Sequence, residues 1–182
     1  MKNTIATLLV AVSTIAVAAN ANAENSFKPY VGVDYNYDNG NENNFNSGTV
    51  NVGTQFNDYF GTEVFYQRSD NDVKTYSGLR QETRYFNAYG LDLNGYLPMG
   101  CEQEFALIGS VGVGEYEFNT GYNLAGIFNG RDHGYGYRFG LGALYNVTDS
   151  VALKAMARYV AFDKIEDNTD MVEYTAGVRY NF

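Results

Sequence analysis

The sequence contains 182 residues, of which 21 are acidic and 12 are basic, and its formal net charge is −9. This acidic balance argues against nucleic acid as the main partner, because phosphate binding relies on clusters of Lys and Arg. Cys101 is the only cysteine, so no disulfide bond can form within the chain, and we interpret its thiol as having no specific role.

The amino-terminal segment is typical of a secretory signal peptide. Lys2 precedes an apolar run that continues to Ala19, and an Ala-Asn-Ala cleavage pattern stands directly before Glu24. A transmembrane helix is the weaker interpretation, because the run is shorter than the roughly 20 residues that span a bilayer and a cleavage site follows it. The sequence therefore predicts a signal peptide over residues 1–23 and one domain over residues 24–182.

The chain after Glu24 alternates apolar and polar residues with the two-residue period of β-strands. In the first such segment, Val31 and Val33 alternate with Asp34 and Asn36. The same period predicts eight strands, over residues 28–37, 49–56, 59–68, 83–97, 104–116, 133–147, 151–159 and 172–182.

Two kinds of connection alternate between these segments. Polar stretches predict long loops over 38–47, 69–81, 117–132 and 161–170, whereas short turns are predicted near 57–58, 98–100 and 148–150. Long external loops and short periplasmic turns are typical of outer-membrane barrels, and strands of about ten residues suit a tilted membrane crossing. We predict an all-β fold, an eight-stranded antiparallel up-and-down transmembrane β-barrel with both termini in the periplasm.

One face of the predicted strands is apolar, and the other carries charged residues and glycines. A soluble lipocalin-like barrel or a β-sandwich also alternates, but a soluble ligand-binding barrel would be apolar inside. Charges withdrawn from water must be paired, and eight strands leave a lumen that side chains can fill. We expect a plugged interior with a charge network of Lys28, Asp34, Glu63, Asp92, Arg138, Lys154, Arg158, Glu173 and Arg179.

The carboxy-terminal strand ends on aromatic residues. Tyr180 and Phe182 share its apolar face, and Gly177 lies on the other face. This ending resembles the signal by which outer-membrane barrels are recognised for insertion. The chain as a whole resembles the bacterial outer-membrane β-barrel family that includes the OmpA/OmpX-type and opacity-like surface proteins, through its signal peptide, this ending, and the segments Pro29–Val33, Tyr59–Glu63 and Asn94–Tyr96.

The resemblance implies a place in the bacterial outer membrane, with outer-membrane lipids, lipopolysaccharide and the assembly machinery as partners. It also implies adhesion to host cells, resistance to host defence, membrane stabilisation or leakage of small solutes. We prefer a surface barrel that displays loops to host or envelope partners, and the alternative is a narrow porin. Exposed aromatic residues are typical contact anchors, and the loop candidates are Tyr76, Phe118, Tyr122 and Phe128.

An enzymatic function is disfavoured. His133 is the only histidine, and no serine partner of the kind used by hydrolytic barrels stands near it in the sequence. The acidic residues of the predicted loops match no calcium-binding spacing. We therefore expect no enzymatic activity, no metal and no cofactor.

Overall fold

The computed structural model describes residues 27–40, 44–76, 80–100, 104–123, 129–163 and 169–182. The predicted signal peptide, Cys101 and Phe128 lie outside these ranges, so the predictions about them stay predictions. Within the described ranges, no helix is long and apolar enough to cross a membrane.

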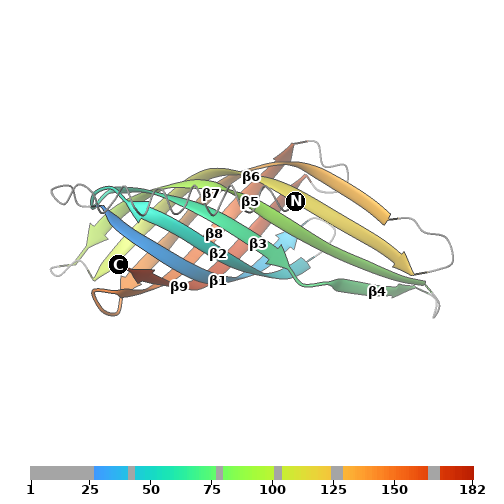
Figure 1. Cartoon of the computed structure of the whole chain (residues 1–182), viewed down its shortest axis with the longest axis horizontal. Coiled ribbons are helices and arrows are strands. Elements are labelled where there is room, and N and C mark those ends of the chain that lie inside the picture. Colours follow the sequence, from blue (N-terminus) through green and yellow to red (C-terminus); the bar gives the residue numbers. More distant parts are fainter. Residues whose placement is uncertain (1–26, 41–43, 77–79, 101–103, 124–128, 164–168) are drawn as a thin grey trace.

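The described residues form nine antiparallel β-strands, which Figure 1 shows wound around a single axis. In chain order they are β1 (Lys28–Gly40), β2 (Asn44–Gln55), β3 (Phe60–Ser69), β4 (Asp72–Tyr76), β5 (Arg80–Met99), β6 (Phe105–Asn123), β7 (Asn129–Asn146), β8 (Val151–Asp163) and β9 (Asp170–Asn181).

The sheet closes on itself because β9 pairs with β1 and β3 pairs with β5. Along β5, the partner changes from β3 at Asn87 to β4 at Arg84. β3 and β4 therefore act as one interrupted wall strand, and the barrel has eight walls. The predicted eight-stranded antiparallel up-and-down barrel is confirmed.

The end of the barrel that holds the carboxy-terminus is closed by short connections, and we call it the turn end (Figure 1). In the turn between β2 and β3, the Asn57 Oδ1 atom accepts hydrogen bonds from the backbone N–H groups of Tyr59 and Phe60, each at 2.8 Å. In the turn between β7 and β8, the Thr148 hydroxyl accepts from the Val151 N–H at 3.0 Å. Such side-chain bonds replace ladder bonds that a tight turn loses.

At the opposite end, several strands are longer than predicted. β1 reaches Gly40, β6 reaches Asn123, and β4 lies inside the predicted loop 69–81. The predicted loops 38–47 and 117–132 were therefore wrong over most of their length. Past the membrane band the outward face is polar as well, so the contrast between an apolar outward face and a polar inward face that predicts these strands is lost there, although inward side chains such as Phe45 stay packed.

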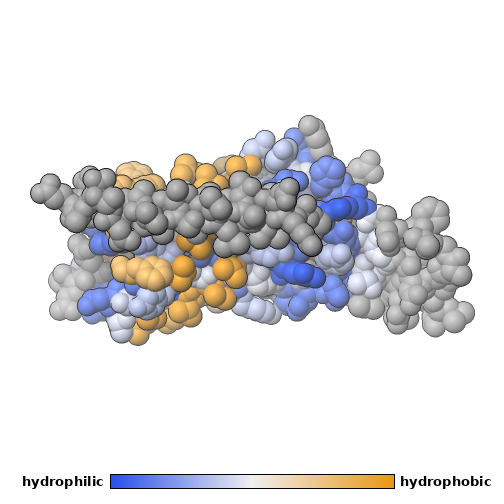
Figure 2. Space-filling model, in the orientation of Figure 1, coloured by the Kyte–Doolittle hydropathy of each residue, from blue (hydrophilic) through white to orange (hydrophobic). Residues whose placement is uncertain are grey.

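The outward face carries an apolar band bordered by aromatic residues. Figure 2 shows apolar residues gathered toward the turn end and hydrophilic residues toward the end where β4 lies. Exposed aromatic residues border this band at the turn end, namely Phe56, Tyr59, Phe60, Tyr145, Tyr180 and Phe182, and toward the other end, namely Tyr35, Tyr37, Tyr66, Tyr135, Tyr159 and Tyr174. Two such rows are typical of a barrel that sits in a bilayer.

The inward face is packed by pairing large side chains with glycines on the adjacent strand. Tyr30 is the register partner of Gly53, and Phe65 is the partner of Gly90. A Cβ atom added at Gly53 would lie 2.4 Å from the Tyr30 ring, and one at Gly90 would lie 2.9 Å from the Phe65 ring. These glycines are therefore required by close packing of the lumen.

Candidate functional site in the barrel interior and projecting sheet

The first interior layer is centred on Lys154 of β8. Its Nζ atom lies 2.7 Å from Asp34 Oδ2 and 3.6 Å from Glu63 Oε1, and all three side chains are buried. The Asn51 side-chain amide donates to the same Asp34 Oδ2 atom at 2.7 Å, and the Tyr30 hydroxyl donates to Glu63 Oε2 at 3.1 Å. One ammonium group thus holds two carboxylates that hydrogen bonds also fix, as buried charges require.

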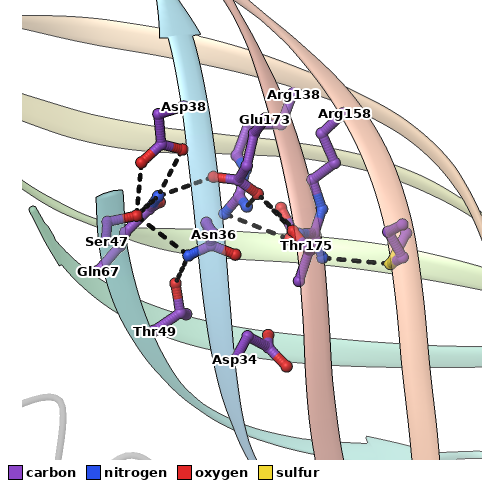
Figure 3. Close-up of polar contacts among 12 residues, drawn as sticks. Asp34, Asn36, Asp38, Ser47, Thr49, Gln67, Arg138, Arg158, Glu173 and Thr175 are labelled. Atoms are coloured by element: carbon purple, nitrogen blue, oxygen red, sulfur yellow. Dashed lines mark hydrogen bonds and ion pairs between the residues drawn. The ribbon is translucent and has the colours of Figure 1, made fainter. Parts of the chain in front are cut away.

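A second layer, shown in Figure 3, is centred on Glu173 of β9. Its carboxylate lies 3.1 Å from Arg138 and 2.7 Å from Arg158, and it accepts a hydrogen bond from Gln67 at 2.8 Å. Arg138 also lies 3.4 Å from Asp92 and stacks 3.8 Å above the Phe65 ring. Charges from four walls of the barrel therefore meet at one height of the lumen.

Two of these ion pairs bridge a strand that lies between the partners. Gly177 of β9 is the register partner of both Asp34 and Lys154, and these two pair above it. Gly112 of β6 has the same relation to Asp92 and Arg138. A Cβ atom at either glycine would lie 1.9 Å from the Asp oxygen, so the absence of a side chain makes room for each ion pair.

Asp38 is an interior charge that the sequence analysis missed, because it was assigned to a loop. It is buried in β1, and its carboxylate accepts hydrogen bonds from Ser47 at 2.5 Å and from Gln67 at 3.3 Å (Figure 3). The signal was present, since Asp38 continues the inward series of Asp34 and Asn36 in steps of two.

Eight of the nine predicted network residues lie buried in the interior, and Lys28 does not. Lys28 stands at the rim of the turn end, where its Nζ atom lies 3.4 Å from Asp58 Oδ1 in an exposed ion pair. Its assignment to the buried network was wrong, because it precedes the part of β1 that both neighbouring strands enclose.

Further layers close both ends of the charged section. Toward the turn end, Arg179 stacks 4.0 Å above the Tyr30 ring and donates to Gln55 and Tyr96. Apolar clusters lie on either side, made of Tyr96, Ala106, Ile108, Leu144, Ala152 and Met156 near the turn end, and of Phe45, Phe65, Phe86, Ala88, Tyr116, Val160 and Met171 near the other end. Buried side chains thus point into the lumen near the turn end, in the charged section and near the other end, and eight strands leave a lumen that side chains can fill.

At the end opposite the turns, part of the wall continues as a projecting sheet, which we define as β4 with residues 80–87 of β5, 115–123 of β6 and 129–135 of β7. The last pair between β7 and β8 is Tyr135 with Asp163, whereas β7 goes on pairing with β6 as far as Asn129. Figure 1 shows β4, β5 and β6 extending past β1 and β9. This sheet is therefore carried beyond the closed barrel.

The outward chemistry changes where the projecting sheet begins. Leu91, Val113 and Tyr137 form one register row, and Tyr89, Glu115 and Tyr135 form the next one toward the projecting end. The Tyr89 hydroxyl donates to the Glu115 carboxylate. A carboxylate on the lipid-facing side is costly against hydrocarbon. The row that holds Glu115 therefore lies outside the apolar band, and the boundary of the band lies between the two rows.

Glu117 and Arg131 pair on the outward face of the projecting sheet. Burial alone would raise the pKa of Glu117, but hydrogen bonds from Arg131 and Asn119 outweigh it and hold that pKa below its usual value. His133 is exposed and is the register partner of Glu117. Among the described residues, its register partner is an acid and not a serine or cysteine nucleophile, so this pair has no hydrolytic triad geometry.

Three of the four predicted loop contact residues, Phe118, Tyr76 and Tyr122, lie in strands. Phe118 lies within β6, and its ring packs 5.4 Å from the Phe86 ring and 5.7 Å from the Phe162 ring, so its assignment to an exposed loop was wrong. Tyr76 and Tyr122 belong to the strand backbones of β4 and β6. Their role in contacts stays a prediction.

The predicted insertion signal is divided between the two faces of β9. Gly177 makes room for the Asp34 carboxylate, whereas Tyr180 and Phe182 are exposed and pack edge to face at 5.2 Å. The backbone N–H of Phe182 donates to the Pro29 carbonyl at 3.0 Å, which joins the two ends of the barrel chain. The role in insertion stays a prediction.

Residues 6–182 match the family of outer membrane protein β-barrel domains. The chain belongs to this family. Comparison with curated protein sequences gives no match. As in other barrels of this kind, the short turns belong on the periplasmic side, so the projecting sheet belongs outside the cell. The protein is thus a barrel of the bacterial outer membrane with surface loops.

Several solved structures share this fold. Neisserial surface protein A is similar with a TM-score of 0.66 at 18% identity, over 86% of this chain and 97% of that chain. Ail, the attachment invasion locus protein of Yersinia pestis, gives a TM-score of 0.58 at 13% identity over 86% and 97%. The amino-terminal β-barrel domain of Pseudomonas aeruginosa OprF gives 0.56 at 16% over 84% and 97%. At these identities the likeness concerns the fold alone.

Proposed function

We propose that this outer-membrane barrel is a surface interaction protein, in which a plugged barrel anchors the projecting sheet and its hairpins for contact with host or envelope partners. The proposal includes export by a cleaved signal peptide over residues 1–23, insertion through the assembly machinery, and contact with lipopolysaccharide around the outer aromatic row. It includes no catalytic role.

The observation that carries the proposal is the continuation of β5, β6 and β7 past the apolar band. The segment of β7 before Tyr135 extends about 20 Å along the strand, at roughly 3.3 Å per residue. The outward face of the projecting sheet carries the ion pair of Glu117 on β6 with Arg131 on β7, and it also carries His133. A polar sheet held in fixed register offers a preorganised contact surface, which lowers the ordering cost of binding.

The filled interior favours display over conduction. A narrow pore needs a continuous aqueous path, whereas Arg138, Arg158 and Glu173 pair across the lumen and aromatic side chains pack above them. Ail is named as an attachment invasion locus protein, and it shares the fold. We therefore place the working surface on the projecting sheet and its hairpins.

The test is adhesion by bacteria that display the barrel. In the variant, residues 120–130 are replaced by Asn-Gly, which joins the paired residues Asn119 and Arg131 by a two-residue hairpin turn. We expect wild-type cells to bind epithelial monolayers or immobilised matrix glycoproteins, and the shortened variant to bind no more than cells carrying an empty vector. Heat-modifiable gel mobility checks that both barrels are folded. Undiminished binding by the shortened variant would overturn the proposal.

A further inference from the structure

A groove of about 530 Å³ opens on the lipid-facing wall near the turn end, across β3, β5, β6 and β7. In its floor, Gly95 of β5 and Gly109 of β6 are direct register partners. The next residues in the same row are Phe60 on one side and Leu141 on the other, and they are 63% and 75% exposed. In this row, two positions without side chains therefore lie between the large apolar side chains of Phe60 and Leu141.

Neither the backbone nor the barrel packing requires these two glycines. A Cβ atom added at Gly95 would have its nearest neighbours at 3.8 and 4.0 Å, and one at Gly109 would have its nearest at 3.8 Å, which are ordinary contacts. Among the described residues, only Gly100 is a glycine with a positive φ. Large apolar side chains would suit this position against hydrocarbon, so the gap leaves room for an apolar group from outside the chain.

An exposed pair of opposite charges at the rim of the turn end is next in the chain to one residue that lines the groove. Tyr59, which lines the groove, directly follows Asp58, and Asp58 forms the exposed ion pair with Lys28. The Lys28 and Asp58 side chains are 55% and 50% exposed. A cation and an anion side by side complement the phosphate and the ammonium of a zwitterionic headgroup.

We propose that this groove binds one phospholipid of the periplasmic leaflet, with an acyl chain lying over Gly95 and Gly109 and a phosphatidylethanolamine-type headgroup against Lys28 and Asp58. The hydrocarbon surroundings supply the chain, and its fit in the groove restores the contacts that the two absent side chains leave unmade. The groove volume is within the roughly 300–1,000 Å³ that ligand sites have.

The first test is native mass spectrometry of barrels refolded in micelles that contain equal amounts of phosphatidylethanolamine and phosphatidylglycerol. The wild type should retain one phosphatidylethanolamine molecule. A Gly95→Leu, Gly109→Leu double variant should reduce that retention about tenfold or more, equivalent to about 1.4 kcal/mol. Gly48→Leu is the control, because Gly48 has no atom within 4 Å of an added Cβ and lies on the outward face of β2. Equal retention by the double variant would overturn the proposal.

Further variants separate the chain site from the headgroup site. Asp58→Asn should weaken the preference for phosphatidylethanolamine over phosphatidylglycerol, because Asp58 is the group that faces the ammonium, while some lipid is still retained. Equal retention of phosphatidylglycerol by the wild type overturns the headgroup assignment. A dimer that disappears in the double variant would assign the groove to a second copy of the chain, and would overturn the lipid proposal.

A measurement on the wild type alone covers the case in which the double variant does not fold. Vesicles containing phosphatidylethanolamine with a diazirine-bearing acyl chain are illuminated, and labelled peptides are mapped. We expect the labels to concentrate on residues 93–111 of β5 and β6 relative to the outward face of β1. Even labelling around the barrel overturns the proposal.

Discussion

Lys154 on β8 and Asp34 on β1 form an ion pair of 2.7 Å although β9 lies between their strands. The two side chains meet above Gly177, the register partner of both. The side chains are only 6% and 2% exposed, so water screens this pair little. The glycine is thus as much a part of the interaction as the two charges, and each of the three can be tested separately.

Lys154→Met should destabilise the barrel by about 3–5 kcal/mol, because it leaves the buried carboxylates of Asp34 and Glu63 without their ammonium partner. Urea unfolding in micelles measures the change. Lys28→Met is the matched control, and it should cost less than about 1 kcal/mol, because the Lys28–Asp58 pair is exposed. Equal effects of the two substitutions would contradict the assignment of Lys154 to a buried layer.

Gly177→Val should also destabilise the barrel, by about 1–3 kcal/mol, because the new side chain overlaps the Asp34 carboxylate and separates the ion pair. The same unfolding experiment applies. Gly48→Val serves as the control, since an added Cβ there meets no atom within 4 Å. If Gly177→Val left the free energy of unfolding unchanged, the Asp34 side chain would have to adopt another conformation without loss of stability.

The refolded barrel should carry no steady ionic current in a planar bilayer. The paired charges around Glu173 and the aromatic cluster that contains Phe86 and Tyr116 occupy the lumen. Single-channel recording measures this directly, with heat-modifiable mobility as the check on folding. Steady small currents that change in an Arg138→Ala variant would favour the narrow pore.

Phe182→Ser should reduce the amount of barrel in the outer membrane several-fold if the terminal aromatic residue is read during insertion. Tyr145→Ser, which removes another exposed aromatic residue at the turn end, is the control for loss of membrane anchoring. Membrane fractionation followed by immunoblotting measures both. Equal loss from the two variants would assign Phe182 to anchoring alone.

Arg131→Ala should raise the pKa of Glu117 toward its usual value, because Arg131 donates one of the hydrogen bonds that hold this pKa down. The Glu117 carboxylate would then become protonated at a higher pH than in the wild type. A carbon-detected NMR titration of the carboxyl group measures the shift. The remaining hydrogen bond from Asn119, at 3.1 Å, should keep part of the depression.

The sequence by itself determined which residues form the membrane wall. Alternation in steps of two set Val31 and Val33 outward and Asp34 inward, and the structure keeps that division. It also carried the eight-stranded fold, because strands with an apolar outward face and a charged inward face can cross a membrane only as a closed sheet. It failed beyond the membrane band, where the outward face turns polar and the strand segments that hold Asp38 and Phe118 resemble loops in the sequence.

Only the tertiary structure decided which charges meet. Periodicity assigns a side chain to a face, but the partner across the lumen depends on register, strand order and the height at which each strand crosses the barrel. Lys154 reaches Asp34 because Gly177 lies between them in register, whereas Lys28, which follows the same period, stands at the rim. The groove over Gly95 and Gly109 arises in the same way, since two glycines far apart along the chain become neighbours only when β5 and β6 pair.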